Sequence, residues 1–114
     1  MPRVEFGIID EFDKENDYSD YEPEKYHCVA VDDDYINDWW NRLELLKTYF
    51  HCYNRPEQAL ARWGVTLIPP ESLESFYEIV AADKRSKSTP ELIELLVLIR
   101  RAITENKYII HYGV

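Results

Sequence analysis

Two His-Cys dipeptides are the first residues of this sequence that suggest chemistry. His27 with Cys28 and His51 with Cys52 supply two imidazoles and two thiols, which is the ligand set of a zinc site. Neighbouring residues on a strand point to opposite faces, so His27 and Cys28 cannot converge on one metal ion. We therefore expect free cysteines, buried as small apolar side chains, and no metal at these positions.

A run of aspartates is the second candidate, because carboxylates are ligands for Mg²⁺ or Ca²⁺. Asp32, Asp33 and Asp34 are followed by Asp38, but the run lacks the alternating ligands and central glycine of an EF-hand loop. No Lys or His stands close by to complete a nuclease site. The simpler interpretation is a helix start, where an aspartate caps free amides and its neighbours favour the positive end of the helix dipole.

Other catalytic patterns are absent from the sequence. None of the five serines lies in a nucleophile-elbow pattern, and three glycines in 114 residues cannot form a loop that cradles phosphate. We expect no catalytic residues, no cofactor and no nucleotide chemistry.

Charge is distributed unevenly along the chain. The net charge is −9, and residues 1–38 hold 13 acidic residues against Arg3, Lys14 and Lys25, whereas the remainder is almost neutral. Such a protein repels nucleic acid and anionic membranes, because both are bound largely through Lys and Arg. A basic protein is the natural partner.

The elements that carry these acids are a pair of strands, a loop and a helix. Residues 3–9 alternate apolar side chains as a strand does, and residues 28–31 are a short apolar run typical of a buried strand. Residues 10–24 form a long acidic surface loop that contains three aromatic rings. Apolar residues then recur at helical spacing over 36–50, which predicts a helix there.

The middle of the chain reads as further helices around one strand. Asn54 is a good N-cap and Gly64 a typical residue after a helix end, so we expect a short helix between them. Residues 65–68 predict a strand, and a helix should begin near Glu71. The basic stretch 84–88 is expected to be a surface loop.

The last helix should open at Thr89 and Pro90, because proline is well tolerated at the first helical position. Ile93 and Val97 widen its predicted buried stripe, and Leu98 falls on the outward row. Residues 107–113 have apolar side chains on both faces and predict an interior strand.

These elements predict one domain over residues 1–114, of the α/β class. The expected order is β-β-α-α-β-α-α-β, with about four strands in a small mixed sheet and about four packed helices. Strands separated by helices imply largely parallel pairing, with the first two strands antiparallel as an open possibility.

Aromatic residues beside the acids suggest a contact surface. Trp39 and Trp40 are about 100° apart on a helix, so a narrow buried stripe takes only one of them completely. An indole or phenol ringed by carboxylates suits a surface rich in Lys and Arg. The alternative is that both indoles are core residues.

Two cysteines, an opening segment without a signal-peptide apolar run and no stretch of ~20 apolar residues lead us to expect a reduced, cytoplasmic protein.

The chain resembles the immunity proteins that bacteria encode beside polymorphic or contact-dependent toxins. The stretches that carry this resemblance are DEFDKENDYSDYEPE, VDDDYINDWW and ENKYIIHYGV. The resemblance implies a non-enzymatic inhibitor whose acidic face occludes a basic, possibly nuclease, toxin in a stoichiometric complex. The contact candidates are Asp13, Asp17, Tyr18, Asp20, Tyr21, Glu22, Asp32, Asp33, Asp34, Tyr35, Asp38 and Trp39.

Three alternatives remain open: a nucleic-acid mimic that sequesters a DNA-binding protein, a structural or oligomeric adaptor that uses Leu98, and a metal-dependent enzyme at the aspartates. Every version of the docking hypothesis requires the acidic residues of the first third to share one surface.

Overall fold

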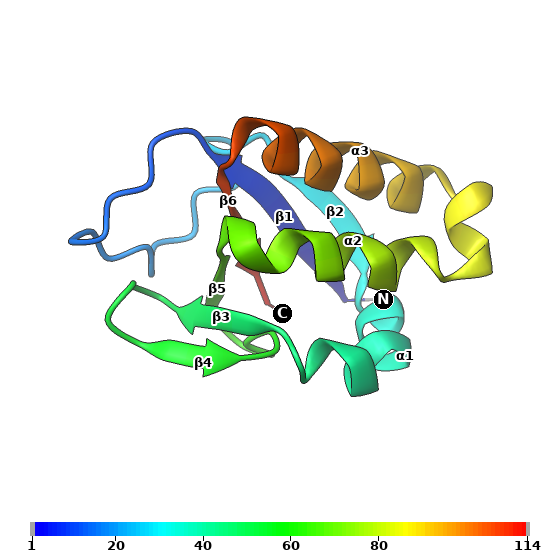
Figure 1. Cartoon of the computed structure of the whole chain (residues 1–114), viewed down its shortest axis with the longest axis horizontal. Coiled ribbons are helices and arrows are strands. Elements are labelled where there is room, and N and C mark those ends of the chain that lie inside the picture. The colour runs from blue at the N-terminus through cyan, green and yellow to red at the C-terminus, as the bar shows by residue number, and fades with distance from the viewer. Residues whose placement is uncertain (1, 114) are drawn as a thin grey trace.

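The computed structural model describes residues 2–113, which form six β-strands in one sheet and three α-helices (Figure 1). The strands are β1 (Arg3–Ile9), β2 (Val29–Asp32), β3 (Lys47–Phe50), β4 (Pro56–Gln58), β5 (Val65–Ile68) and β6 (Tyr108–Tyr112). The helices are α1 (Asp33–Leu43), α2 (Leu73–Ala81) and α3 (Pro90–Glu105). Short 3₁₀ helices span Pro70–Ser72 and Lys84–Lys87. The α/β class is confirmed, with more strands and fewer helices than expected.

All neighbouring strands in the sheet are antiparallel, so the expectation of largely parallel pairing is wrong. The strand order is β2-β1-β6-β5-β3-β4. Two helices, α2 and α3, lie between β5 and β6 in the chain, and β6 runs antiparallel to β5. The single-helix crossover through α1 joins β2 to β3, which are not neighbours in the sheet.

The strands predicted at the two ends of the chain are confirmed. β1 covers the expected residues and β6 lies between β1 and β5, in the interior of the sheet. Both are buried on both faces, because Phe6 and Ile109 face the helices while Ile9 and Ile110 belong to a second cluster. The central strands therefore need cover on either side.

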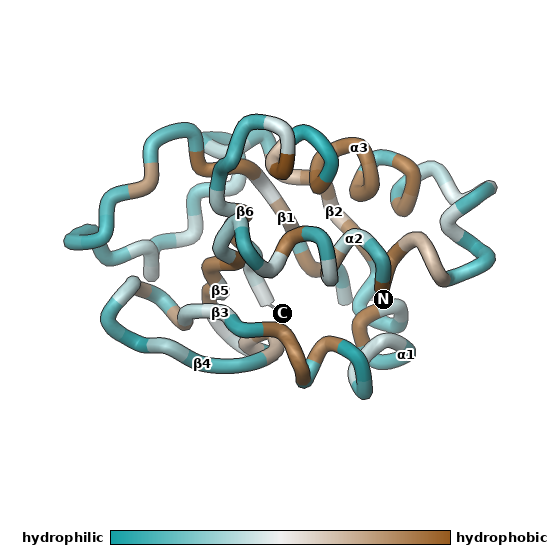
Figure 2. Tube along the Cα trace, viewed as in Figure 1, coloured by the Kyte–Doolittle hydropathy of each residue, from teal (hydrophilic) through white to brown (hydrophobic). Residues whose placement is uncertain are grey.

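Helices cover one face of the sheet, and the loop that joins β1 to β2 covers part of the other. The larger core packs β1, β2 and β6 against all three helices, whereas the smaller core joins Ile9, Leu67 and Ile110 to Tyr18 and Tyr26 of the loop. Figure 2 shows hydrophobic residues on β1 and β5 and alternating with hydrophilic ones along α2 and α3, whereas the loop between β1 and β2 is mainly hydrophilic. Within residues 2–113, no helix has the length and apolar character that crossing a membrane requires.

The helix predicted over 36–50 ends at Leu43 and is followed by β3, so the second half of that prediction is wrong. Leucine and phenylalanine there fit both a helical and a strand period. Tertiary pairing decides between them, because β3 lies between β4 and β5. The Thr48 hydroxyl is buried and donates a 2.7 Å hydrogen bond to the carbonyl of Ala59, which fixes the strand in place.

No helix forms between Asn54 and Gly64, which is a second error. The segment contains β4 and a bent loop in which Ala59 has a φ of 63° and Gly64 a φ of 145°. Gly64 therefore marks a turn into β5 and not the end of a helix. The amide of Ala61 bonds the buried Thr66 hydroxyl, an interaction that no local pattern reveals.

The boundaries of α3 agree with the prediction, but its buried face does not. Pro90 is its first residue, and Asn106 ends it in the left-handed conformation. Leu98 is buried, while Ile93 is 42% exposed and Val97 is 64% exposed. The helix packs between α2 and the β1-β2 edge of the sheet, so its buried arc is rotated toward Leu98.

Candidate functional site

The acidic residues of the first third lie in two separate groups. β1 and β2 are antiparallel, with Arg3 opposite Asp32, so the aspartate run lies at the start of β1 and the acidic loop 10–24 leaves its far end. The seven residues of β1 separate Asp32 from the start of the loop at Asp10 by roughly 20 Å. The end of the loop returns over Glu5 and Tyr112. Figure 1 shows the loop at the left end of the molecule and α1 at the right. The single acidic face expected from the sequence is therefore divided.

The aspartates at the start of α1 mostly serve the fold. Asp32 is the N-cap and accepts a 2.9 Å hydrogen bond from the amide of Asp34. The Asp33 side chain is buried, 3.6 Å from a guanidinium nitrogen of Arg62. Asp38 pairs with Arg85 at 2.9 Å. Helix capping, the simpler interpretation of the aspartate run, accounts for Asp32. Arg62 and Arg85 neutralise Asp33 and Asp38.

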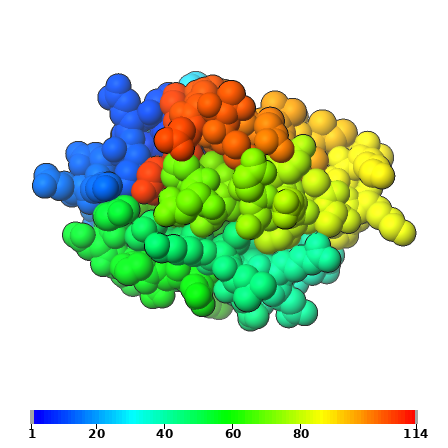
Figure 3. Space-filling view, in the orientation of Figure 1, coloured from blue at the N-terminus to red at the C-terminus, as the bar shows by residue number. Residues whose placement is uncertain are grey.

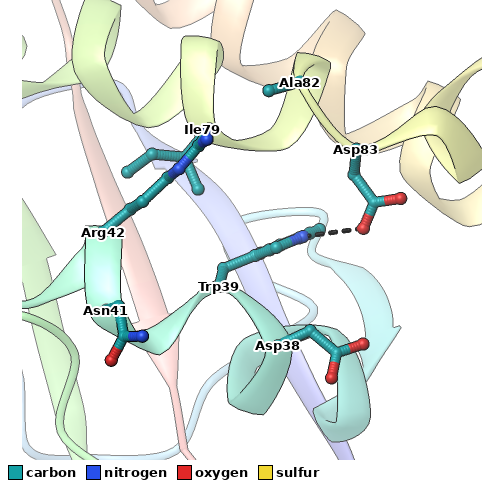
Figure 4. Close-up of a pocket in the computed structure, with 7 residues that line it drawn as sticks. All are labelled: Asp38, Trp39, Asn41, Arg42, Ile79, Ala82 and Asp83. Carbon is teal, nitrogen blue, oxygen red and sulfur yellow. Dashed lines mark hydrogen bonds between the residues drawn. The ribbon is translucent and has the colours of Figure 1, made fainter.

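A pocket of about 310 Å³ between α1 and the end of α2 contains Trp39 (Figure 4). The indole is buried and its Nε1–H donates a 2.9 Å hydrogen bond to Asp83. Hydrogen bonds from Arg85 hold the pKa of Asp83 far below its ordinary range. Tyr35 is half-buried, stacked on Trp39 and covered by the Arg85 guanidinium. Trp39 is thus a packing residue and not an exposed anchor, because Asp83 and Tyr35 enclose it.

The acidic loop 10–24 is held against the sheet by its aromatic rings. Phe12 stacks on Tyr108 with 3.7 Å between ring centroids and on Tyr18 with 5.4 Å. Tyr18 is buried, and its amide donates a 2.8 Å hydrogen bond to the carbonyl of His51. A β-bridge between Asp17 and Cys52 lies beside this bond. Two of the three rings in the loop therefore anchor it and are not free for a partner.

Gly7 permits the returning part of this connection to lie close to β1. A Cβ at position 7 would stand 2.8 Å from the carbonyl oxygen of Tyr26 and from the sulfur of Cys28. Any larger residue would push the segment that follows the acidic loop away from the sheet.

Within residues 2–113, most carboxylates of the acidic loop have no cationic partner. The loop holds eight acidic residues and one lysine. Asp10 pairs with Lys107 at 2.9 Å, whose hydrogen bond lowers the pKa of Asp10, and Glu22 lies 3.8 Å from Lys25. The six without a Lys or Arg nitrogen within 4.0 Å are Glu11, Asp13, Glu15, Asp17, Asp20 and Glu24.

Local hydrogen bonds fix two of these carboxylates. Asp13 accepts from the amide of Glu15 at 2.9 Å, and Asp17 accepts from the amide and hydroxyl of Ser19. The bonds from Ser19 lower the pKa of Asp17. These local hydrogen bonds hold both carboxylates in place.

A pocket of about 360 Å³ opens at the base of the acidic loop. Three acidic residues, two tyrosines and a lysine are among the residues that line it: Ile9, Asp10, Glu11, Asp13, Asn16, Tyr18, Lys25 and Tyr26. The ammonium of Lys25 lies 5.5 Å from the centre of the Tyr26 ring. The pocket thus already contains one cation, the Lys25 ammonium, beside an aromatic ring.

Tyr21 is the one aromatic ring of the acidic loop that remains exposed, at 64%. Its edge packs against Tyr112, with ring centroids 5.0 Å apart, and its hydroxyl donates to the Glu5 carboxylate. This bond raises the pKa of Tyr21 to about 12, so the phenol stays neutral at physiological pH.

The residues of the sequence-based site therefore divide into exposed loop residues and buried residues. Asp13, Asp17 and Asp20 belong to the acidic loop, whereas Tyr21 and Glu22 lie where the chain returns over the sheet, against Glu5 and Tyr112. Tyr18, Asp33 and Trp39 are buried. Sequence reasoning did not single out Tyr26 and Lys25 as parts of the pocket, since only folding brings them beside the start of the loop.

Metal and thiol chemistry have little geometric support in the part of the chain that is described. No three His, Cys, Asp or Glu side chains of residues 2–113 are arranged to hold a metal ion. Cys28 and Cys52 are free, and burial raises the pKa of Cys28 to about 12, which disfavours the thiolate.

Comparisons of this chain with protein-family models, with curated proteins and with solved structures find no match.

Proposed function

We propose that this protein is a non-enzymatic binding protein that uses the acidic loop 10–24 to dock on a basic protein partner. The observation that carries the proposal is the group of six carboxylates without cationic partners on a loop that aromatic packing holds in place. Unpaired like charges repel one another, and a basic ligand bound to the loop would relieve this repulsion.

Electrostatic steering is the first step of this function. A field from one end of the molecule accelerates encounter with a basic surface and orients it toward the loop. Because Asp13 and Asp17 are already fixed by local hydrogen bonds, little side-chain entropy is lost when a partner's Lys or Arg reaches them.

The second step is slow dissociation of the partner, to which the pocket and Tyr21 contribute. A lysine or arginine side chain of the partner would enter the pocket beside Glu11 and Asp13, the two of its carboxylates that have no Lys or Arg nitrogen within 4.0 Å. Tyr21 adds an exposed ring elsewhere on the loop, beside Glu5 and Tyr112. Aromatic and arginine contacts of this kind dominate the binding energy of protein interfaces.

The class of binding protein that we propose is an immunity protein, in line with the resemblance noted above. The partner would be a basic toxin, and the complex would block its active surface in a one-to-one ratio. Asp32, Asp34 and Asp38 lie at the other end of the molecule, so we no longer include them in the same contact surface.

The test compares wild-type protein with a loop variant in which Asp13→Asn, Glu15→Gln and Asp20→Asn remove three charges. A matched variant with Glu44→Gln, Glu57→Gln and Glu71→Gln removes three exposed charges elsewhere. We expect a basic protein from the source cells to be retained by wild type and by the matched variant, and to be lost from the loop variant.

The captured partner then allows two direct measurements. Its association rate should fall by roughly tenfold or more in the loop variant and should decrease with salt for wild type. Its expression alone should be toxic and its co-expression with this protein harmless. A rate that neither salt nor the loop variant alters would refute docking through the loop, and a harmless partner would refute the immunity class alone.

A further inference from the structure

The outer face of α3 carries two neighbouring exposed apolar residues that the docking proposal does not use. Ile93 and Val97 lie one turn apart and are 42% and 64% exposed, although the helix buries five other residues on its inner face. Figures 1 and 3 show α3 along the top of the molecule, with no other segment above it. Two exposed aliphatic residues on a well-ordered helix form the centre of a possible contact.

The charged residues beside Ile93 and Val97 complement the same residues of a second, identical copy. Glu94 precedes Val97 by one turn and Arg101 follows it by one turn, and the seven-residue spacing places Glu94 and Arg101 on the same flank of the helix. When two identical helices pack antiparallel about a two-fold axis, the same flank of each faces the other. Glu94 of one copy then meets Arg101 of the second copy, and Arg101 meets Glu94.

We infer that α3 is a self-association face on which a second copy of this chain docks antiparallel, with Val97 near the two-fold axis. Ile93 supplies the adjacent apolar contact in each copy. Arg101 is 58% exposed and bonds Glu105 at 3.2 Å, and exchanging such an exposed intrahelical pair for one between copies has a small energetic cost.

The exposed edge of strand β2 is a poorer site for self-association, because two of its backbone groups already bond to side chains. The carbonyl of Ala30 accepts a 3.0 Å hydrogen bond from Arg3, and the amide of Asp32 donates a 3.0 Å hydrogen bond to Glu91. Arg3 and Glu91 also pair with each other at 3.1 Å. An edge strand protected in this way is a poor template for another strand, so self-association favours the helix face.

The predicted dimer is weak. A 16-residue helix is roughly 24 Å long, and a single helix-to-helix contact is smaller than a standard stable interface. We therefore expect reversible association at micromolar or higher protein concentration, which sedimentation equilibrium measures directly. The average mass should rise from 13.6 kDa toward twice that value as the concentration increases.

Charge-swap variants test the orientation. Glu94→Arg and Arg101→Glu should each weaken the dimer by roughly tenfold, because each change places like charges at both symmetry-related contacts. The double variant E94R/R101E should recover the wild-type constant to within about threefold. Val97→Asp should abolish the dimer, and Glu57→Arg on the exposed strand β4 is the matched control that leaves it unchanged.

Several outcomes overturn the inference. A wild-type protein that stays monomeric at several hundred micromolar refutes it, and so does a double variant that fails to recover association while circular dichroism shows an intact fold. A Val97→Asp variant that still dimerises places the contact elsewhere. None of these results bears on the acidic loop, whose own test uses different residues.

Discussion

His111 is the most completely buried ionisable residue that the functional proposals leave unused. Its Nδ1 lies 3.1 Å from the Thr66 hydroxyl, and that hydroxyl accepts the Ala61 amide, so the hydroxyl proton is free to donate to Nδ1. The ring proton then resides on Nε2, which has no hydrogen-bond partner among residues 2–113. Burial, aided by the charge of Arg62, lowers the pKa of His111 to about 3.

This shift predicts how stability depends on pH. Above pH 6.5 the imidazole is neutral in both folded and unfolded chains, whereas between about pH 6.5 and 3 only the unfolded chain takes up the proton. Stability should therefore fall as the pH decreases through this range, by up to about 1.4 kcal/mol per pH unit from this one residue.

Urea unfolding at pH 7, 5.5 and 4.5 measures that slope, and His111→Gln provides the comparison. The variant is expected to be less stable at pH 7 but to lose less further stability on acidification. Equal slopes for the two proteins would mean that carboxylates alone, such as Asp83, govern the acid response.

Among the elements, the acidic loop is where local composition and tertiary packing disagree most. Its charge and length are typical of a mobile linker. Phe12, stacked against Tyr18 and Tyr108, instead attaches it to the face of the sheet that the helices leave open. Order in the loop thus depends on a few rings and not on its abundant polar residues.

Phe12→Ala should release the loop without unfolding the sheet. We expect amide hydrogen exchange over residues 13–20 to accelerate by roughly tenfold, since aromatic contacts of this kind contribute about 0.5–1.5 kcal/mol beyond burial. Amides of β1 and β6 should keep their protection. Tyr21→Ala, which removes an exposed ring from the same loop, should change exchange much less; an equal acceleration would contradict the anchoring role of Phe12.

At the scale of the whole molecule, charge is concentrated at one end and neutralised at the other. Arg62 and Arg85 compensate the acids near α1, whereas the loop retains most of its excess. The self-repulsion of the loop weakens the compact state and is screened by salt.

Ionic strength should consequently stabilise this protein. We expect the midpoint of thermal unfolding to rise between 10 and 150 mM NaCl, opposite to the behaviour of a protein that depends on surface ion pairs. The variant carrying Asp13→Asn, Glu15→Gln and Asp20→Asn should be more stable at low salt and respond less to added salt. A midpoint that falls with salt would show that the loop charges do not oppose folding.

The pattern of the sequence determined several parts of the structure on its own. Alternating side chains located β1, two-sided apolar character placed β6 in the interior, and Thr89 with Pro90 marked the start of α3. These features depend on neighbouring residues, so a local pattern is sufficient to predict them. The concentration of acidic residues in the first third of the chain was also evident from the sequence alone.

Only the tertiary structure decided which surfaces those residues share. The antiparallel pairing of β1 and β2 sends the acidic loop and Asp32 to opposite ends, and the packing of α1 against Asp83 buries Trp39. Lys47–Phe50 became a strand because β4 and β5 pair with it from either side. Strand partners and helix rotation are set by contacts between residues distant in sequence, which no local periodicity encodes.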